Sequence, residues 1–153
     1  MRAMRLSEIM SSPVETILAG AAAVEARTAM HRAGIRHLVV LGRARQVVGV
    51  VCAHDLRGAE PDSTVEDLMS RPAATLPPSA DAKEAAKLLR RGDIGSVAVV
   101  DHARLVGIVT TSDLLGLLGK GALRVQPTPT KWTLPKRGPT HRPQRRRPAG
   151  SLR

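Results

Sequence analysis

GVVCAHDL at residues 49–56 and GIVTTSDL at residues 107–114 are two versions of one phrase. Upstream of both phrases the same residues recur at a constant offset: Met10, Ser11, Pro13 and Thr16 match Met69, Ser70, Pro72 and Thr75. Three further matches lie between these patterns and the phrases: Glu25, Ala26 and Ile35 with Glu84, Ala85 and Ile94. An internal repeat defines the structural unit before any single element is considered. The sequence therefore predicts two copies of one unit, each closed by a turn that carries a carboxylate.

The composition predicts one small protein with an aliphatic core. The chain has 153 residues with no Phe, no Tyr and a single Trp, Trp132. Its one cysteine, Cys52, excludes an intrachain disulfide framework and a multi-cysteine zinc site. No apolar run approaches the roughly 18 residues of a membrane span, and no signal peptide opens the chain. We expect a cytoplasmic protein with no membrane contact.

The positive charge is concentrated at the C-terminal end. Residues 1–119 hold 14 Lys and Arg against 13 Asp and Glu, whereas residues 120–153 hold 10 Lys and Arg and no acid. Six prolines alternate with basic and small polar residues after Gly121. Such a segment buries too little apolar surface to offset the entropy of ordering. We expect residues 121–153 to be a disordered basic tail.

Both copies predict the same order of elements. A short helical lead-in (6–10; 65–69) is followed by an extended piece near Thr16 or Thr75 and a helix with one apolar face. Two aliphatic runs in each copy then read as buried strands joined in a hairpin: 38–41 with 47–51, and 97–100 with 105–109. A closing helix begins at Asp55 or Asp113.

These elements predict an α/β (α+β) fold of two repeats, residues 6–60 and 61–120. Each repeat is a small three-stranded sheet with helices on one face. One such unit alone would bury too little surface to be stable. We therefore expect the two sheets to pack against each other around a pseudo-twofold axis.

The order of elements, the two closing phrases and the Met-Ser-x-Pro-x-x-Thr patterns at 10–16 and 69–75 resemble the CBS domain. CBS domains occur in tandem pairs, often called Bateman modules, and the resemblance covers residues 6–119. It implies a regulatory module, not an enzyme, that binds AMP, ADP, ATP or S-adenosylmethionine between the repeats and needs no cofactor. It also implies a flat homodimer. Since the chain shows no effector domain, an effector protein is expected to act in trans.

The resemblance also implies ligand-binding residues. In the second repeat, Thr110, Ser112 and Asp113 would hold ribose and phosphate. Base and phosphate would meet an opening segment and a strand start, which comprise Thr75, Leu76, Pro77, Ile94, Gly95, Ser96 and Val97. In the first repeat the corresponding residues are Asp55 with Thr16, Ile17, Leu18, Ile35, Arg36, His37 and Leu38.

The two copies differ in their polar groups. The first has Cys52 and His54 where the second has the hydroxyls of Thr110 and Ser112. Arg36 and His37 in turn replace Gly95 and Ser96, and basic side chains make stronger hydrogen bonds to phosphate than neutral ones. Because hydroxyls complete only the second phrase, we expect Asp113→Ala to weaken binding more than Asp55→Ala.

Other interpretations of these residues are weaker or stay open. Thr110 and Asp113 also form a helix capping box, but capping does not explain why Asp55 recurs without the hydroxyl. Cys52 and the histidines show no metal-ligand spacing, and no nucleophile or Gly-rich phosphate loop accompanies the aspartates. Arg145, Arg146 and Arg147 could bind nucleic acid phosphates. A nucleic-acid-associated protein, dimerised through the repeats, is the alternative function, and a solvated tail without such a role is equally compatible with the sequence.

Overall fold

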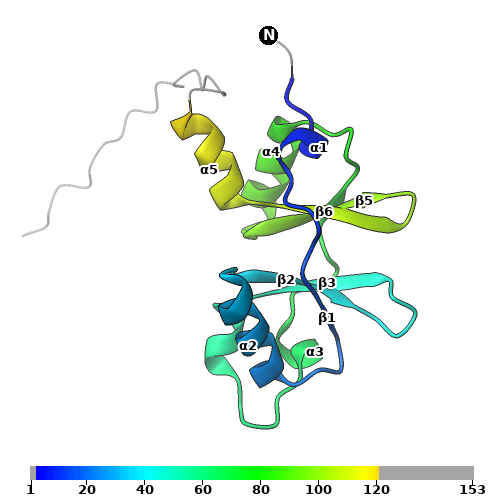
Figure 1. Cartoon of the computed structure of the whole chain (residues 1–153), viewed down its shortest axis with the longest axis vertical. Helices are drawn as coiled ribbons and strands as arrows, with labels where there is room; N and C mark the ends of the chain where they lie inside the picture. Colours follow the sequence, from blue (N-terminus) through cyan, green and yellow to red (C-terminus); the bar gives the residue numbers. More distant parts are fainter. Residues whose placement is uncertain (1–2, 121–153) are drawn as a thin grey trace, which may run out of the picture.

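The computed structural model describes residues 3–120, so the predicted disorder of the tail and its predicted contact with nucleic acid lie outside the described residues. The first copy contains α1 (Leu6–Ile9), β1 (Thr16–Leu18), α2 (Ala23–Ala33), β2 (His37–Leu41), β3 (Val47–Cys52) and the 3-10 turn η1 (Asp55–Gly58). The second contains α3 (Val65–Leu68), β4 (Thr75–Leu76), α4 (Ala82–Gly92), β5 (Ser96–Asp101), β6 (Arg104–Thr110) and α5 (Thr111–Gly119). Figure 1 shows two stacked units, one built around the sheet of each copy.

Each unit contains one three-stranded sheet, as predicted. The strand orders are β1-β2-β3 and β4-β5-β6. In both sheets the first strand runs parallel to the second, which pairs antiparallel with the third. The crossover between the parallel strands contains α2 or α4, so each sheet has helices on one face. The predicted α+β architecture is confirmed.

The sheets face each other in the middle of the molecule, with the helices outside (Figure 1). Val39, Ala98 and Ile108 are buried in one cluster to which both sheets contribute. Alternate residues of the same strands point the other way, as the pleat requires. Leu38 and Val40 therefore join the core under α2, while Val97 and Val99 join the core under α4.

The lead-in helices are exchanged between the units. α1 lies beside α4, and α3 lies beside α2 (Figure 1). Leu6 is buried in the core of the second unit, where its N–H donates to Ala80 O at 2.8 Å. Val65 is buried in the core of the first, where its N–H donates to Ala21 O at 2.9 Å. Each sequence repeat therefore contributes its first turn of helix to the other unit.

The glycine in each closing phrase allows this exchange. After leaving α3, the chain pairs with β3 through reciprocal hydrogen bonds between Ser70 and Val50 of 2.9 and 3.1 Å. A Cβ at Gly49 would lie 2.6 Å from Ser70 O, and one at Gly107 would overlap Met10 Sδ. A side chain at either position would force the crossing segments apart.

The predicted closing helices differ in length. α5 spans Thr111–Gly119, whereas the first closing helix is only the single turn η1. Gly58 disfavours helix, and Pro61 restricts the conformation of the preceding Glu60. These residues end the first copy early and lead the chain into α3.

The exchange predicts that a change at Leu6 weakens the second unit, not the unit that its sequence repeat forms. Leu6→Ala should lower the free energy of unfolding by about 2–5 kcal/mol because it removes a fully buried side chain. Urea denaturation measures this loss, and Leu18→Ala, at an exposed position, is the matched control with a change of about 0.5 kcal/mol or less.

Amide hydrogen exchange locates the effect. Protection in Leu6→Ala should fall more in α4, β5 and β6 than in β2 and β3. A loss concentrated in β2 and β3 would contradict the exchange.

Candidate functional site

A cleft of about 210 Å³ lies where the two sheets begin and the chain crosses between the units. Four segments line it: the start of β2, the end of β3 with the following turn, the approach to β4, and the start of β5. The lining residues are His37, Val50, Cys52, His54, Asp55, Ser70, Pro72, Ala73, Ala74, Asp93, Ile94, Gly95 and Ser96. Both repeats therefore contribute to one site.

The starts of β2 and β5 meet at the back of the cleft. His37 is half-buried against Gly95, where an added Cβ would lie 2.6 Å from His37 Nε2. Glycine at this position therefore makes room for the imidazole. Since His37 and Ser96 are equivalent positions in the two repeats, this contact lies near the pseudo-twofold axis.

The first closing phrase places Asp55 at the cleft. Asp55 Oδ2 accepts a hydrogen bond of 2.9 Å from Cys52 N, which folds the carboxylate back against the end of β3. Ala53 N donates to Arg36 O at 2.8 Å and ties the turn to the start of β2. A carboxylate has about four acceptor positions, so Asp55 can accept further hydrogen bonds.

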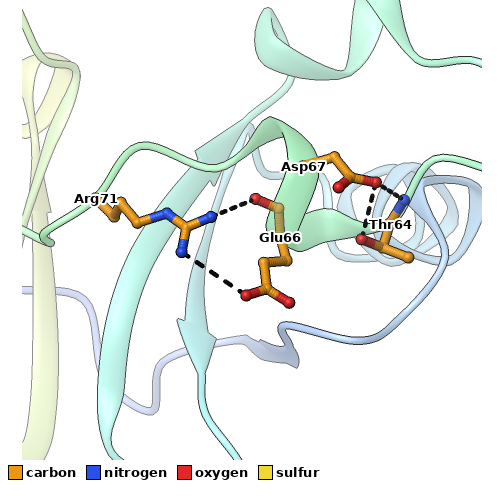
Figure 2. A network of polar contacts seen from close by, with 4 residues as sticks. All are labelled: Thr64, Glu66, Asp67 and Arg71. Atoms are coloured by element: carbon orange, nitrogen blue, oxygen red, sulfur yellow. Dashed lines mark hydrogen bonds and ion pairs between the residues drawn. The ribbon is translucent and has the colours of Figure 1, made fainter.

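The approach to β4, which forms the third wall of the cleft, follows α3, and α3 carries several polar contacts. Arg71 Nη2 donates to Glu66 O at 3.2 Å, and Arg71 Nη1 lies 3.7 Å from Glu66 Oε1. At the other end of the helix, Asp67 Oδ2 accepts from Thr64 N at 2.9 Å and from Thr64 Oγ1 at 3.0 Å. Figure 2 shows both sets of contacts. They hold α3 and the segment that carries residues 70–74 into the cleft.

Ser96 has a buried polar atom without a hydrogen-bond partner. Its side chain faces away from the core under α4 because its neighbour Val97 faces into that core. The residue is 4% exposed, and its Oγ has no hydrogen-bond partner. A buried hydroxyl left unpaired costs about 1–3 kcal/mol. A ligand in the cleft that hydrogen-bonds Ser96 would recover this energy.

Burial also shifts titratable groups at the site. Burial lowers the pKa of His37, and the charge of Arg36 lowers it further, while Asp55 and Asp113 act in the opposite direction. Burial and the hydrogen bond with Asp55 raise the pKa of the Cys52 thiol. The lowered pKa favours neutral His37 at neutral pH, and the raised one keeps Cys52 a thiol. Outside the cleft, the bonds from Thr64 hold the pKa of Asp67 below its usual range.

The cleft brings together five of the residues implied by the family resemblance: His37, Asp55, Ile94, Gly95 and Ser96. It groups Asp55 with the strand start of the second repeat, whereas the sequence grouped it with residues of its own repeat. The exchange of lead-in helices explains this. Because Ser70 pairs with β3, the approach to β4 begins beside the first closing phrase.

The other implied residues lie elsewhere. Leu38 and Val97 are fully buried under the helices, and Ile17 and Leu76 pack against the same two cores. Ile35 lines a different hollow beside α2, and Leu18 lines one beside α3. Four further residues are exposed: Thr16, Arg36, Thr75 and Pro77.

Asp113 acts as a helix cap in this structure. Its Oδ2 accepts from Thr110 N at 2.7 Å and from Thr110 Oγ1 at 3.0 Å, and its own N–H donates to Thr110 Oγ1 at 3.3 Å. This is the capping box predicted as the alternative interpretation. Ser112 is exposed on the first turn of α5. The Asp113 carboxylate accepts from Thr110 N the same backbone hydrogen bond that Asp55 accepts from Cys52 N, but Asp113 does not line the cleft.

Several lining residues were missed from the sequence: Val50, Cys52, His54, Ser70, Pro72, Ala73, Ala74 and Asp93. Asp93 was detectable, because it occupies the repeat position of Gly34. The segment 70–74 could not be assigned without knowing that α3 packs on the first unit.

Larger hollows exist, but neither closing-phrase aspartate lines them. One of about 880 Å³ lies between the turns of the first unit and α3, and one of about 530 Å³ lies beside α2 and η1. Within residues 3–120 no three His, Cys, Asp or Glu side chains converge as metal ligands. None of the helices described is long and apolar enough to cross a bilayer.

Solved structures resemble the whole two-unit arrangement. The CBS domain pair of protein MJ0100, in complex with 5′-methylthioadenosine and S-adenosyl-L-methionine, superimposes with a TM-score of 0.74 at 27% identity, covering 78% of this chain and 99% of that one. The hexameric CBS-CP12 protein from bloom-forming cyanobacteria gives a TM-score of 0.69 at 26% identity, covering 80% and 76%.

Curated relatives are longer than the matched region. An uncharacterized protein of Methanopyrus kandleri is 32% identical over 119 residues, which are 72% of this chain and 58% of the relative. The magnesium transporter MgtE of Bacillus subtilis is 35% identical over 85 residues, 55% of this chain and 19% of the transporter. A homoserine O-acetyltransferase of Methanococcoides burtonii is 32% identical over 117 residues, 74% of this chain and 24% of the enzyme.

The family itself is shown directly. The model of the CBS domain matches residues 6–62 and again residues 65–120. These two matches span most of the chain and follow the two repeats observed in the sequence and the fold. The chain belongs to the CBS domain family and contains two CBS domains in tandem.

Proposed function

We propose that this CBS pair is a regulatory module that binds an adenosyl compound or an adenine nucleotide in the cleft between its repeats. The observation that carries the proposal is the buried, unpartnered Ser96 Oγ in a cleft that also holds the Asp55 carboxylate. The ligands of the similar MJ0100 pair, methylthioadenosine and S-adenosylmethionine, support it. AMP, ADP and ATP belong to the same proposed class.

The chemistry of the walls suits the two parts of a nucleoside. Asp55 would accept hydrogen bonds from the ribose hydroxyls, which are donors that a carboxylate recognises in pairs. Val50, Ala74 and Ile94 offer apolar surface for the base. Ser96 would donate to, or accept from, a polar atom at the back of the site.

The cleft also suggests how binding would be communicated. Its walls come from both repeats, so a bound ligand would connect segments that are otherwise joined through the sheet interface. A ligand shifts a conformational equilibrium only by its difference in affinity for the two arrangements. We propose that an effector protein recognises the arrangement that the ligand stabilises. The proposed role is regulatory, and the homoserine O-acetyltransferase matches this chain over 24% of its own length.

A homodimer is the proposed assembly. Leu115 is 60% exposed and Leu118 is 38% exposed, both on α5. Two apolar side chains on one short helix are better buried against a partner than left in water. The family resemblance points to a second copy of this chain.

Contact with nucleic acid through residues 121–153 stays a prediction from charge. Deleting residues 122–153 separates this function from ligand binding in the cleft. Nucleotide binding should persist, while any salt-dependent retention of nucleic acid should disappear.

Asp55→Asn should weaken ligand binding about 10–100-fold, because a hydrogen bond to a charged group contributes about 1.5–3 kcal/mol. Asp113→Asn, the same change at the equivalent position, should alter affinity less, which reverses the ranking drawn from the sequence. Isothermal calorimetry with methylthioadenosine, S-adenosylmethionine, AMP, ADP and ATP measures both. The absence of heat with every compound at millimolar concentration would remove the proposal. Equal losses would show that Asp55 has no special role.

The lowered pKa of His37 predicts a pH-dependent stability. Because folding lowers this pKa, the unfolded chain binds the proton more tightly. Stability from this group is therefore present above the ordinary histidine pKa of about 6.5 and is lost as the pH falls through the folded value. Urea midpoints measured between about pH 7.5 and pH 5 should fall less steeply in His37→Gln than in the wild type. His31→Gln, an exposed histidine on α2, is the control, and an unchanged slope in His37→Gln would contradict the prediction.

The proposed dimer predicts a light-scattering mass of twice that of the chain. Leu115→Lys combined with Leu118→Lys should shift the protein to a monomer with the same circular dichroism. Val24→Lys, at a residue on α2 that is 61% exposed, is the control and should leave the dimer intact. A wild-type monomer, or dissociation by both sets of changes, would count against α5 as the interface.

A further inference from the structure

The cleft carries negative charge. Among its lining residues, Asp55 and Asp93 are the acidic side chains, and none is Lys or Arg. Burial favours the neutral form of the lining His37 imidazole, so His37 does not compensate this charge. Among the lining residues, a phosphate would meet two carboxylates and no Lys or Arg side chain.

The nearest arginines are directed elsewhere. Arg71 is next to Pro72 in the wall of the cleft, yet its guanidinium is paired with Glu66 on α3 (Figure 2). Arg36 precedes His37, but its side chain is exposed and does not line the cleft. The sequence predicts Arg36 and His37 as partners of a phosphate; in this structure His37 lines the cleft and Arg36 does not.

Asp93 occupies a position that normally favours glycine. It caps α4 in the left-handed region with φ of 48°, and its counterpart Gly34 caps α2 with φ of 64°. Left-handed backbone is strain-free for glycine and less favourable for a residue with a Cβ, although Asp and Asn adopt it more readily than most. The second repeat thus places a carboxylate at the cleft through Asp93. The equivalent residue of the first repeat, Gly34, has no side chain.

Two further observations point to a small ligand at this place. Ser96 Oγ is buried in the cleft without a partner, so the acidic pair stands beside a group that itself awaits a hydrogen bond. The cleft volume of about 210 Å³ lies below the roughly 300–1,000 Å³ of typical ligand sites. A nucleoside suits this space better than a nucleotide with a chain of phosphates.

We infer that Asp93, together with Asp55, makes the cleft selective for adenosyl compounds without phosphate, and that Asp93 determines this selectivity. Neutral thioether nucleosides and sulfonium nucleosides are the class favoured. The sulfonium charge would be attracted by the same carboxylates that repel phosphate. This inference rests on the proposed function and names the ligand class of the same site.

The test compares methylthioadenosine and S-adenosylmethionine with AMP and ATP on the full chain by isothermal calorimetry. Methylthioadenosine should bind at least about tenfold more tightly than AMP, a difference of about 1.4 kcal/mol. AMP binding as tightly as methylthioadenosine, or more tightly, would overturn the inference and leave the proposed function standing. No binding of any adenosyl compound would overturn both.

Asp93→Asn tests the specificity residue, since asparagine also tolerates the left-handed backbone of this cap. AMP affinity should rise about threefold to tenfold, methylthioadenosine affinity should change less than twofold, and S-adenosylmethionine affinity should fall. Asp62→Asn, an exposed carboxylate outside the cleft, is the matched control and should change none of the three. Equal changes for AMP and methylthioadenosine would remove Asp93 as the determinant.

The competing explanation is that the Arg36 guanidinium holds phosphate at the site, and Arg36→Gln tests it. It should leave the ratio of methylthioadenosine to AMP affinity unchanged, because the Arg36 side chain is outside the cleft. A selective loss of AMP binding in Arg36→Gln would show that a guanidinium holds phosphate at the site, and would overturn the inference.

Discussion

The hydrogen bonds from Leu6 to Ala80 and from Val65 to Ala21 join each lead-in helix to the opposite unit, and the rest of the structure depends on this exchange. The side chains of Leu6 and Val65 are fully buried in the cores that they join. The two repeats are therefore connected by packing on both sides as well as by the sheet interface. Because the exchanged segments pair with the interior of β3 and β6, a side chain at position 49 or 107 would collide with them.

The same crossing creates the candidate site. The segment that leaves α3 passes the first closing phrase before it reaches the second sheet, so Asp55 lies opposite Ile94 and Ser96. Asp113 is the equivalent residue and accepts the equivalent backbone hydrogen bond from Thr110 N, but it does not line this cleft. A duplicated phrase thus serves two purposes. In the first repeat Asp55 is directed to the cleft, and in the second Asp113 begins the longer helix α5.

The secondary structure was largely predictable because each element has a local cause. The aliphatic runs at 38–41 and 97–100 became β2 and β5, since continuous β-branched residues suit strands buried on both faces. The first closing helix is only the single turn η1, and Gly58 and Pro61 account for its short length. Asp93 was also visible as the counterpart of Gly34, but its importance depends on the wall that it faces.

The grouping of site residues could not be derived in the same way. Residues 70–74 lie far along the chain from Cys52 and Asp55, and their place in the cleft depends on where α3 packs. Likewise, the family resemblance implies Leu38 and Val97 as ligand contacts, and only the fold shows that the pleat places both side chains under the helices. Arg71 lies in the right segment to meet a phosphate, yet its pairing with Glu66 draws it away.

The sequence alone determined the duplication, the order of elements and the family, because these follow from periodicity and from residues compared between the two copies. Tertiary structure alone decided which carboxylate faces the cleft, which repeat supplies the opposite wall and what charge a ligand meets. The reason is physical: strand pairing and helix capping act between neighbours in the chain, whereas the exchange of α1 and α3 joins segments that only the packed cores bring together.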